Sequence, residues 1–360
     1  KEEKKEGYQG GKHGNGVVGM VAEVYNKWER RAPLCPEHVR KLTSLDGLRV
    51  LVEPSARRVF TDEEYARAGA EITPDLSPAG TIFGVKQVPV ANLLPDRTYV
   101  FFSHTIKAQP ENMALLDAIL ERNVRMIDYE TINKDGLRSA PRLIAFGGYA
   151  GRAGLIDGMR GLGERLLNLG YSTPLLSLGS SYMYQSLDLA KQAVADMGEG
   201  IAAGGIPKDF APLVVGFTGN GNVSQGAQEI FRLLPHKMVA VDELPHLEPR
   251  RDLVYGVVAE EEAMVRKKAA HGGGALEDRA HYYAHPEQYE AIFHEKVAPH
   301  LSMLVNCTYW DHRYPRLLTT DQMRDIRSAQ GGQPRLQMIA DVSCDIGGSI
   351  EFLAKSTHIE

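Results

Sequence analysis

The amino-acid sequence predicts an α/β protein built of two Rossmann-like, doubly wound domains with a crevice between them. Short, almost wholly apolar runs recur in both halves of the 360-residue chain, and helix-like stretches separate them. Such runs are typical of parallel strands that are buried on both faces of a sheet. A glycine-rich turn in the second half lies between an apolar run and an amphipathic stretch, as in a dinucleotide-binding loop.

Each apolar run of the first half leads into polar residues of catalytic type. The runs cover 16–22, 48–52, 81–85, 100–102 and 125–127, and they lead into Glu23, Glu53, Lys86, His104 and Glu130. The carboxyl ends of parallel strands lie on one edge of a sheet, so we expect Arg31, Lys86, His104 and Glu130 to converge. This combination favours acid–base chemistry on an anionic substrate. The alternative is that each residue only marks where a strand reaches the surface.

The expected domain boundaries follow from these runs. Residues 16–146 are expected to form a substrate-binding and catalytic domain, to which residues 346–360 return. Residues 147–345 are expected to form the dinucleotide-binding domain, and the helical periodicity of 151–170 predicts a crossover helix at its start. Residues 1–15 are charged, glycine-rich and without apolar periodicity, which is typical of a disordered arm or a remnant of cloning.

The second half contains the pattern of a dinucleotide-binding unit. An apolar run at 211–217 precedes the glycine turn, an amphipathic helix at 227–234 follows it, and a second run at 237–241 ends at Asp242. Glycines allow the backbone to approach a pyrophosphate, and the helix N-terminus supplies N–H groups and a positive dipole end. The turn residues that we expect at the cofactor are Gly219, Gly221, Asn222, Val223, Ser224 and Gly226, with Ser224 in the place of the third glycine. The alternative is a tight turn that binds nothing.

Composition excludes several other classes of function. The formal net charge of -5 gives no basic excess for nucleic acid, and no apolar run reaches membrane-spanning length. The 3 cysteines are far apart, which predicts a reducing compartment, the cytoplasm or alternatively the mitochondrial matrix. No metal site is expected, because the histidines between 250 and 300 lack ligand spacing. The oligomeric state does not follow from the sequence, and a homo-oligomer is possible.

Four motifs together resemble a known family. They lie at 28–34 (WERRAPL), 101–109 (FFSHTIKAQ), 219–227 (GNGNVSQGA) and 344–351 (CDIGGSIE). They closely resemble the lysine-ketoglutarate reductase domain of bifunctional aminoadipic semialdehyde synthase, in the superfamily of alanine dehydrogenase and saccharopine dehydrogenase. The resemblance covers about residues 16–360. It implies an excised domain whose partner, a saccharopine dehydrogenase domain, belongs to the same polypeptide.

The resemblance implies that L-lysine condenses with 2-oxoglutarate and that NADPH reduces the imine to saccharopine. Lys86 and His104 would be the catalytic pair, because condensation and dehydration need proton transfer. Arg31 would bind a carboxylate of 2-oxoglutarate as a bidentate pair. By position, Lys107, Glu130 and Arg142 match further substrate-site residues, and Asp345 matches an aspartate near the nicotinamide ribose.

The 2′-position of the cofactor is the point on which local chemistry and resemblance disagree. Asp242 would accept a hydrogen bond from a ribose hydroxyl and repel a 2′-phosphate, which favours NAD. The family reductase prefers NADPH, so we expect NADPH rather than NADH, with Arg250 or Arg251 neutralising the phosphate.

Two alternative functions stay open. One is another enzyme of the same fold, a lysine-forming saccharopine dehydrogenase or an alanine dehydrogenase, although a single-substrate alanine site would not need Lys107 and Glu130. The other is a non-catalytic nucleotide-sensing module, which would tolerate loss of Lys86 or His104. Both of these residues are present.

Overall fold

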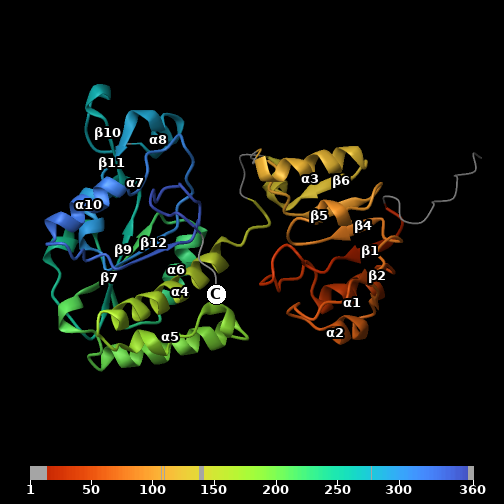
Figure 1. The fold of residues 1–360 in the computed structure, drawn as a ribbon, viewed down its shortest axis with the longest axis horizontal. Helices are drawn as coiled ribbons and strands as arrows, with labels where there is room; N and C mark the ends of the chain where they lie inside the picture. The colour runs from red at the N-terminus through yellow and green to blue at the C-terminus, as the bar shows by residue number, and fades with distance from the viewer. Residues whose placement is uncertain (1–13, 107, 109, 138–141, 277, 356–360) are drawn as a thin grey trace, which may run out of the picture. The chain divides into compact units, whose positions relative to one another are not determined.

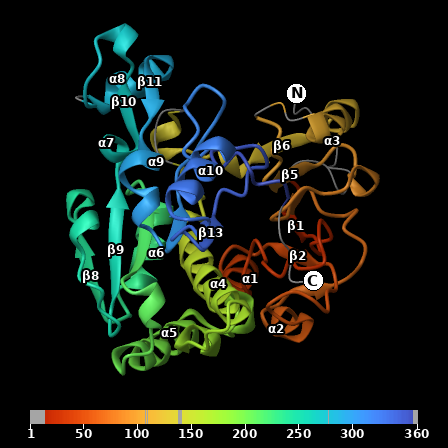
Figure 2. The ribbon, with the colours of Figure 1, turned by 60° about the vertical axis from the view of Figure 1, so that its left-hand side comes forward.

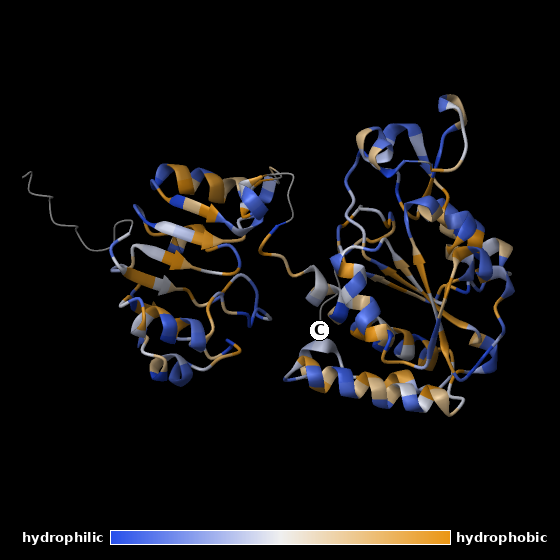
Figure 3. Ribbon diagram, turned by 180° about the vertical axis from the view of Figure 1, so that it is seen from behind, coloured by the Kyte–Doolittle hydropathy of each residue, from blue (hydrophilic) through white to orange (hydrophobic). Residues whose placement is uncertain are grey.

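The computed structural model describes residues 14–355, except 107, 109, 138–141 and 277. The chain divides into two compact units, unit 1 up to Ala145 and unit 2 from Phe146 (Figure 1), and each is described by itself. In both units apolar strands lie inside, and hydrophilic helix surfaces face outward (Figure 3). Within the described part of the chain, no helix combines the length and apolar character that crossing a membrane requires.

Unit 1 contains a 6-stranded parallel sheet with the order β3-β2-β1-β4-β5-β6. Its strands are β1 (Val17–Met20), β2 (Arg49–Val52), β3 (Glu71–Ile72), β4 (Thr81–Phe83), β5 (Thr98–Phe101) and β6 (Arg125–Asp128). Its helices are α1 (Pro36–Ser44), α2 (Asp62–Arg67) and α3 (Pro110–Glu121), with short 3-10 turns η1 (Val90–Asn92), η2 (Tyr129–Thr131) and η3 (Lys134–Gly136). The strand order reverses between β1 and β4, where a doubly wound sheet opens a crevice for ligands.

The two faces of this sheet have separate cores. Val39 of α1 and Tyr65 of α2 pack against Val18 and Val50 on one face. On the other face, α3 packs with the side chains of Leu51, Ile82 and Phe101. Local signals explain where the helices begin: Pro36 occupies the first turn of α1, and α2 begins with a capping box formed by Thr61 and Glu64.

Unit 2 contains a 5-stranded parallel sheet with the order β13-β12-β7-β9-β8. Its strands are β7 (Leu213–Thr218), β8 (His236–Val239), β9 (Val254–Ala259), β12 (Met303–Asn306) and β13 (Met338–Asp341), and a separate antiparallel pair is β10 (Val265–Lys267) with β11 (Tyr289–Ala291). One face is covered by α4 (Gly147–Asn168), α5 (Leu187–Ala202) and α6 (Asn222–Phe231). The other face packs against the layer that contains α7 (Glu261–Met264), α8 (Arg279–Ala284), α9 (Phe293–Lys296) and α10 (Thr320–Ala329).

The predicted crossover helix is α4, and its glycines explain how closely it packs. An added Cβ at Gly151 would lie 1.8 Å from the carbonyl oxygen of Val223, at the start of α6. Any side chain there would push α4 away from α6. The helix-weakening glycines are therefore needed for close packing.

The structure corrects two sequence-based expectations about the fold. The strand β9 was not predicted, and it lies between β7 and β8, so that β8 is at the edge of the sheet (Figure 2). The segment after residue 345 was expected to return to the first domain, but its described part belongs to unit 2. Ile350 forms a β-bridge with Leu318 and is buried in the core of unit 2. Burial of its apolar side chain there stabilises the position of this segment. Residues 356–360 lie outside the described residues.

Candidate active site and cofactor loop

The carboxyl edge of the unit 1 sheet brings together most of the predicted catalytic residues. The loops after β4, β5 and β6 carry Lys86, His104 and Glu130 respectively. The imidazole Nδ1 of His104 lies 3.7 Å from a carboxylate oxygen of Glu130, and the guanidinium of Arg142 lies 3.2 Å from the other oxygen. Lys107 lies outside the described residues. The predicted convergence on one edge is thus present within unit 1.

The environment of Lys86 favours its neutral amine. Burial, followed by the positive charge of Arg31, lowers the pKa of Lys86 below its usual value. The carboxylates of Glu29, Glu23 and Glu130 oppose this shift, so they lie within electrostatic reach of the amine. A lower pKa brings a lysine closer to the range in which it can act as a general base.

Glu23, which follows β1, holds the loop that carries Lys86. Its carboxylate accepts hydrogen bonds from the backbone N–H groups of Val85 at 2.6 Å and Lys86 at 3.0 Å. Burial raises the pKa of Glu23, although these two hydrogen bonds partly oppose the shift. Glu23 therefore joins the two strands between which the sheet order reverses.

His104 is held in an unusual backbone conformation. Its φ of 53° lies in the left-handed region, which is strained for a residue other than glycine. Asn112 of α3 donates a hydrogen bond to the carbonyl oxygen of His104 at 3.0 Å. Strained backbone of this kind is often found at functional sites and needs surrounding contacts to hold it.

A buried hydrogen bond links the loops of His104 and Glu130. The hydroxyl of Ser103 donates to a carboxylate oxygen of Asp128, and both side chains are buried. The other oxygen of Asp128 accepts from the backbone N–H of Glu130 at 2.8 Å. Asp128 therefore fixes the start of the turn that carries Glu130, next to His104.

Arg31 forms a planar pair within the protein. Its guanidinium donates two hydrogen bonds to the buried Glu29, at 2.8 and 2.7 Å. Burial raises the pKa of Glu29, but the hydrogen bonds and charge of Arg31, with the charge of Lys86, lower it by more. Glu29 thus fixes the plane of the guanidinium. Sequence reasoning did not assign a role to Glu29, Glu23, Ser103 or Asp128.

A cavity of about 240 Å³ lies beside Lys86 in unit 1. Its lining includes Glu23, Glu53, Lys86 and Gln87. Burial raises the pKa of Glu53, partly opposed by the hydrogen bond that it accepts from the N–H of Ala22. The cavity therefore has both polar and apolar walls, at the point where the strand order reverses.

In unit 2, the glycine turn connects β7 to α6 as predicted. Gly219 has a φ of +66°, which glycine adopts without strain, and its N–H donates to the carbonyl of Ala259 at 2.8 Å. Gly221 is the N-cap of α6, and an added Cβ there would have no atom within 4 Å. The first-turn N–H groups of a helix have no intrahelical acceptor. This open helix N-terminus fits a pyrophosphate.

The two later members of the predicted loop have a packing role. Ser224 is fully buried, and its hydroxyl accepts a hydrogen bond from Gln228 at 3.0 Å. An added Cβ at Gly226 would lie 2.1 Å from the carbonyl oxygen of Gly148 in α4. Asn222 is exposed and Val223 is half-buried in the first turn of α6. The structure therefore leaves Gly219, Gly221 and the first turn to face a ligand.

A second cavity, of about 260 Å³, adjoins this turn. Gly219 and Gly221 line it on one side, and Cys307 and Thr308, after β12, line another part. Aromatic side chains supply much of the remaining wall, namely Tyr282, Tyr283, Tyr309, Trp310 and Tyr314. Burial raises the pKa of Cys307 to about 12, so its thiol is not a nucleophile at neutral pH. Space and aromatic walls beside the turn suit a planar ring.

The residues predicted at the 2′-position do not gather. Asp242 is exposed and follows the edge strand β8. Arg250 forms an ion pair with Asp252, and Arg251 donates to the carbonyls of Ile206 at 2.7 Å and Gly204 at 3.0 Å. Asp345 is exposed in the turn after β13.

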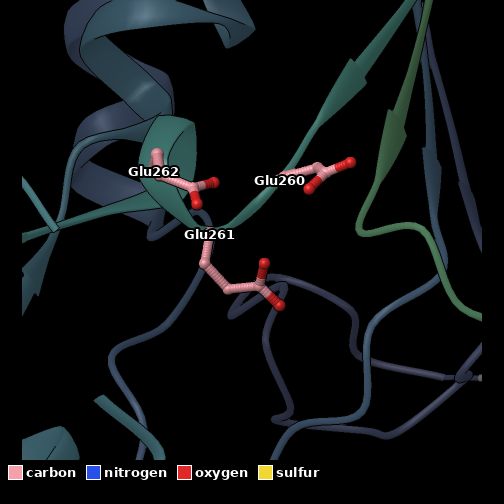
Figure 4. Close-up of side chains that lie close together, drawn as sticks. All are labelled: Glu260, Glu261 and Glu262. Atoms are coloured by element: carbon pink, nitrogen blue, oxygen red, sulfur yellow. The ribbon is translucent and has the colours of Figure 1, made fainter. Parts of the chain in front are cut away.

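Three consecutive carboxylates lie after β9, within 4.8 Å of one another (Figure 4). They belong to Glu260, Glu261 and Glu262, and Arg279 of α8 forms ion pairs with all of them. Tyr283 also donates a hydrogen bond to Glu261 at 2.5 Å. The cluster is thus an internally paired group.

Comparisons with known proteins agree with this fold. Residues 19–153 match the family model "Alanine dehydrogenase/PNT, N-terminal domain". Alpha-aminoadipic semialdehyde synthase of Arabidopsis thaliana is 50% identical, over 97% of this chain and 34% of that protein. The mitochondrial protein of the same name from Bos taurus is 43% identical, over 97% of this chain and 38% of that protein. The chain therefore spans about a third of the length of these relatives.

More distant similarities extend over part of the chain or to the fold alone. Saccharopine dehydrogenase (NAD(+), L-lysine-forming) of Candida glabrata is 34% identical over 36% of this chain. A solved L-alanine dehydrogenase superposes with a TM-score of 0.54 and 18% identity, covering 96% of this chain and 78% of the other, which shows a shared fold. The predicted α/β fold and the resemblance to aminoadipic semialdehyde synthase are confirmed.

Proposed function

Because this chain is related over 97% of its length to the alpha-aminoadipic semialdehyde synthases, we propose that it condenses L-lysine with 2-oxoglutarate and reduces the product to saccharopine. The ε-amine attacks the keto carbon, a carbinolamine forms and loses water, and the resulting imine is reduced to a secondary amine. The cofactor, when bound, supplies the hydride for that reduction. The observation that carries the proposal is the gathering of Lys86, His104 and Glu130 on one edge of the unit 1 sheet.

Lys86 is proposed to be the general base of the condensation. The ε-ammonium of the substrate must lose a proton before it can attack, and burial of Lys86 lowers its pKa, which is the direction that a general base requires. The charge of Arg31 contributes to that lowering, so a bound carboxylate would weaken it. Binding of the keto acid at Arg31 would then raise the proton affinity of Lys86.

His104 is proposed to transfer the proton that the carbinolamine oxygen needs to leave as water. The imidazole lies 3.7 Å from a carboxylate oxygen of Glu130, and Arg142 holds the same carboxylate. The buried link from Ser103 to Asp128 keeps the two loops in register. These contacts support an acid role for His104 and a substrate-amine or positioning role for Glu130.

Arg31 is proposed to bind a carboxylate of 2-oxoglutarate. Guanidinium groups pair with carboxylates in a planar, directional manner. The pairing with Glu29 orients Arg31 beside Lys86, which is where the keto acid would need to be.

A nicotinamide cofactor fits the dehydrogenase fold and the glycine turn of unit 2, and we propose NADPH. The open space at Gly221, which a Cβ would fill, is the place where the pyrophosphate would approach the backbone. Asp345 keeps its proposed place near the nicotinamide ribose. We propose a saccharopine dehydrogenase domain of the same polypeptide as the partner. We propose the cytoplasm as the compartment, although the bovine relative is named as mitochondrial.

The lysine-forming direction with NAD is the second candidate. It would use the same residues in reverse, and the similarity to the Candida glabrata protein favours it over part of the chain. Both directions are tested by one experiment.

The experiment follows NADPH oxidation with the full chain while lysine or 2-oxoglutarate is omitted in turn. We expect oxidation only when both are present, and no oxidation when pyruvate and ammonium replace them. A Lys41→Met variant, which alters an exposed lysine of α1, is the matched control for Lys86→Met. Oxidation that needs only one substrate would contradict the proposal, and faster turnover of saccharopine with NAD would favour the reverse reaction.

A further inference from the structure

The order of strands in unit 2 changes which residue lies at the cofactor ribose. In a Rossmann unit the acidic residue that meets the ribose ends the strand beside the one that leads into the glycine turn. Here that neighbour is β9, which pairs with β7 along its whole length, from Leu213↔Val254 to Thr218↔Ala259. The strand β8, which ends before Asp242, pairs with β9 and lies at the edge.

Glu260 therefore occupies the place that sequence spacing assigned to Asp242. It directly follows Ala259, whose carbonyl accepts the N–H of Gly219 at 2.8 Å. The side-chain amide of Asn220, inside the glycine turn, lies 3.4 Å from a carboxylate oxygen of Glu260. Asp242 lies one strand further from the turn, and neighbouring strands are about 4.8 Å apart.

A cavity beside Glu260 has the character of an adenosine site. Its volume is about 640 Å³, and Glu260 lines it. Its apolar lining includes Val241, Pro245, Val258 and Ala263, which can pack against a planar base. Glu260 thus lies between the glycine turn and an apolar space, as a ribose-binding residue must.

Arg279 is the cation that this arrangement places next to the 2′-position. Its guanidinium pairs with Glu260 and with Glu262 at 3.0 Å, and its side chain is 46% exposed. The earlier candidates, Arg250 and Arg251, precede β9 and so lie toward the amino edge of the sheet, whereas the glycine turn lies at its carboxyl edge. Because Arg279 is ion-paired with Glu260, a 2′-phosphate close to Glu260 would lie near its guanidinium.

We propose that the Glu260–Arg279 pair reads the 2′-position of the cofactor. This inference rests on the proposed function, because it presumes a nicotinamide dinucleotide on the glycine turn. Arg279 donates to the 2′-phosphate of NADPH, while Glu260 orients Arg279 and would accept from the 2′-hydroxyl of NADH. Discrimination between the two cofactors is set by the balance of these opposite charges.

The test measures equilibrium dissociation constants of the full chain for NADPH and NADH by calorimetry. For Arg279→Ala we expect the dissociation constant for NADPH to rise roughly ten- to a hundredfold, because one charge-assisted contact is lost. The dissociation constant for NADH should change by less than about threefold. Arg279→Lys should retain part of the NADPH affinity. For Glu260→Gln we expect the preference to shift toward NADPH, because the repulsive carboxylate is gone.

The comparison variants identify competing assignments. Arg324→Ala removes an exposed arginine from a surface ion pair on α10 and should change neither constant. Asp242 and Lys296 also line this cavity. Asp242→Asn and Lys296→Ala should nevertheless leave the ratio of the two constants within about threefold of the wild type. A shift in either variant without one in Arg279→Ala would overturn the assignment. A wild type that binds neither dinucleotide would overturn both this inference and the proposed function, whereas unchanged discrimination in Arg279→Ala would overturn this inference alone.

Discussion

Two glycines of the predicted cofactor loop should respond differently to alanine, Gly221 at the N-cap of α6 and Gly226 within that helix. At Gly226 the added Cβ would lie 2.1 Å from the carbonyl oxygen and 2.8 Å from the carbonyl carbon of Gly148. Both are backbone atoms of α4, so relief requires the whole helix to move. Overpacking usually costs about 1–3 kcal/mol and occasionally more, and backbone overlap places this case near about 3 kcal/mol.

At Gly221 the same change meets open space. An added Cβ has no atom within 4 Å, and the φ of -77° suits an L-residue. Stability should fall by less than about 1 kcal/mol, the scale of a poorer N-cap. The methyl group would occupy the approach of the pyrophosphate, so the dissociation constant for NADPH should rise at least about tenfold, or about 1.4 kcal/mol.

Thermal unfolding and calorimetric titration separate these effects. Gly226→Ala should lower the melting temperature by roughly 6–12 °C, since about 1 kcal/mol corresponds to about 2–4 °C in a unit of this size. Gly221→Ala should lower the melting temperature by less than about 4 °C but should lose affinity for NADPH. If Gly226→Ala unfolds at the wild-type temperature, α4 and α6 do not pack as described. If Gly221→Ala binds NADPH normally, the pyrophosphate does not approach this turn.

Further predictions concern unit 1. Lys86→Met should lower turnover roughly a hundred- to ten-thousandfold. It should also raise the free energy of unfolding at a pH below the lowered pKa of Lys86, because burial penalises only the protonated amine, and this gain should shrink as the pH rises toward 10.5. A variant less stable than the wild type at neutral pH would contradict this. His104→Gln should lower turnover by a similar factor, and near-normal turnover would leave the histidine a structural role. Arg31→Lys should raise the KM for 2-oxoglutarate far more than that for lysine, because charge stays but the planar fork is lost; equal effects would assign Arg31 to folding. Asp128→Asn should lower kcat while leaving NADPH affinity unchanged, because it loosens Glu130 beside His104; loss of NADPH affinity would point to general unfolding.

The sequence predicted β1, β2, β4, β5 and β6 of unit 1, because each is an apolar run that leads into polar residues. It missed the short β3, and β6 is less buried than predicted, since Arg125 and Ile127 are exposed. The gathering of Lys86, His104 and Glu130 followed from one rule, that parallel strands share a carboxyl edge. Their supporting partners did not follow from it. Whether Arg31 pairs with Glu29, or Ser103 with Asp128, depends on how loops from separate strands meet in space.

Strand order was the main feature that the sequence did not reveal. The run Val254–Ala259 is as apolar as β7 and could have been recognised as a strand. Its position between β7 and β8 could not, because spacing along the chain does not state which strands pair. That single insertion moves the ribose-facing acid from Asp242 to Glu260. The packing role of Gly226 was equally hidden, since it depends on the path of α4.

The central claim is that the ε-amine of lysine is joined to the keto carbon of 2-oxoglutarate. The most direct measurement incubates the full chain with NADPH, 2-oxoglutarate and lysine labelled at the ε-nitrogen, and then identifies the labelled product by mass spectrometry. The account predicts labelled saccharopine, formed in step with NADPH oxidation and roughly a hundred- to ten-thousandfold more slowly with Lys86→Met. Label in glutamate, or NADPH oxidation without saccharopine, would contradict it.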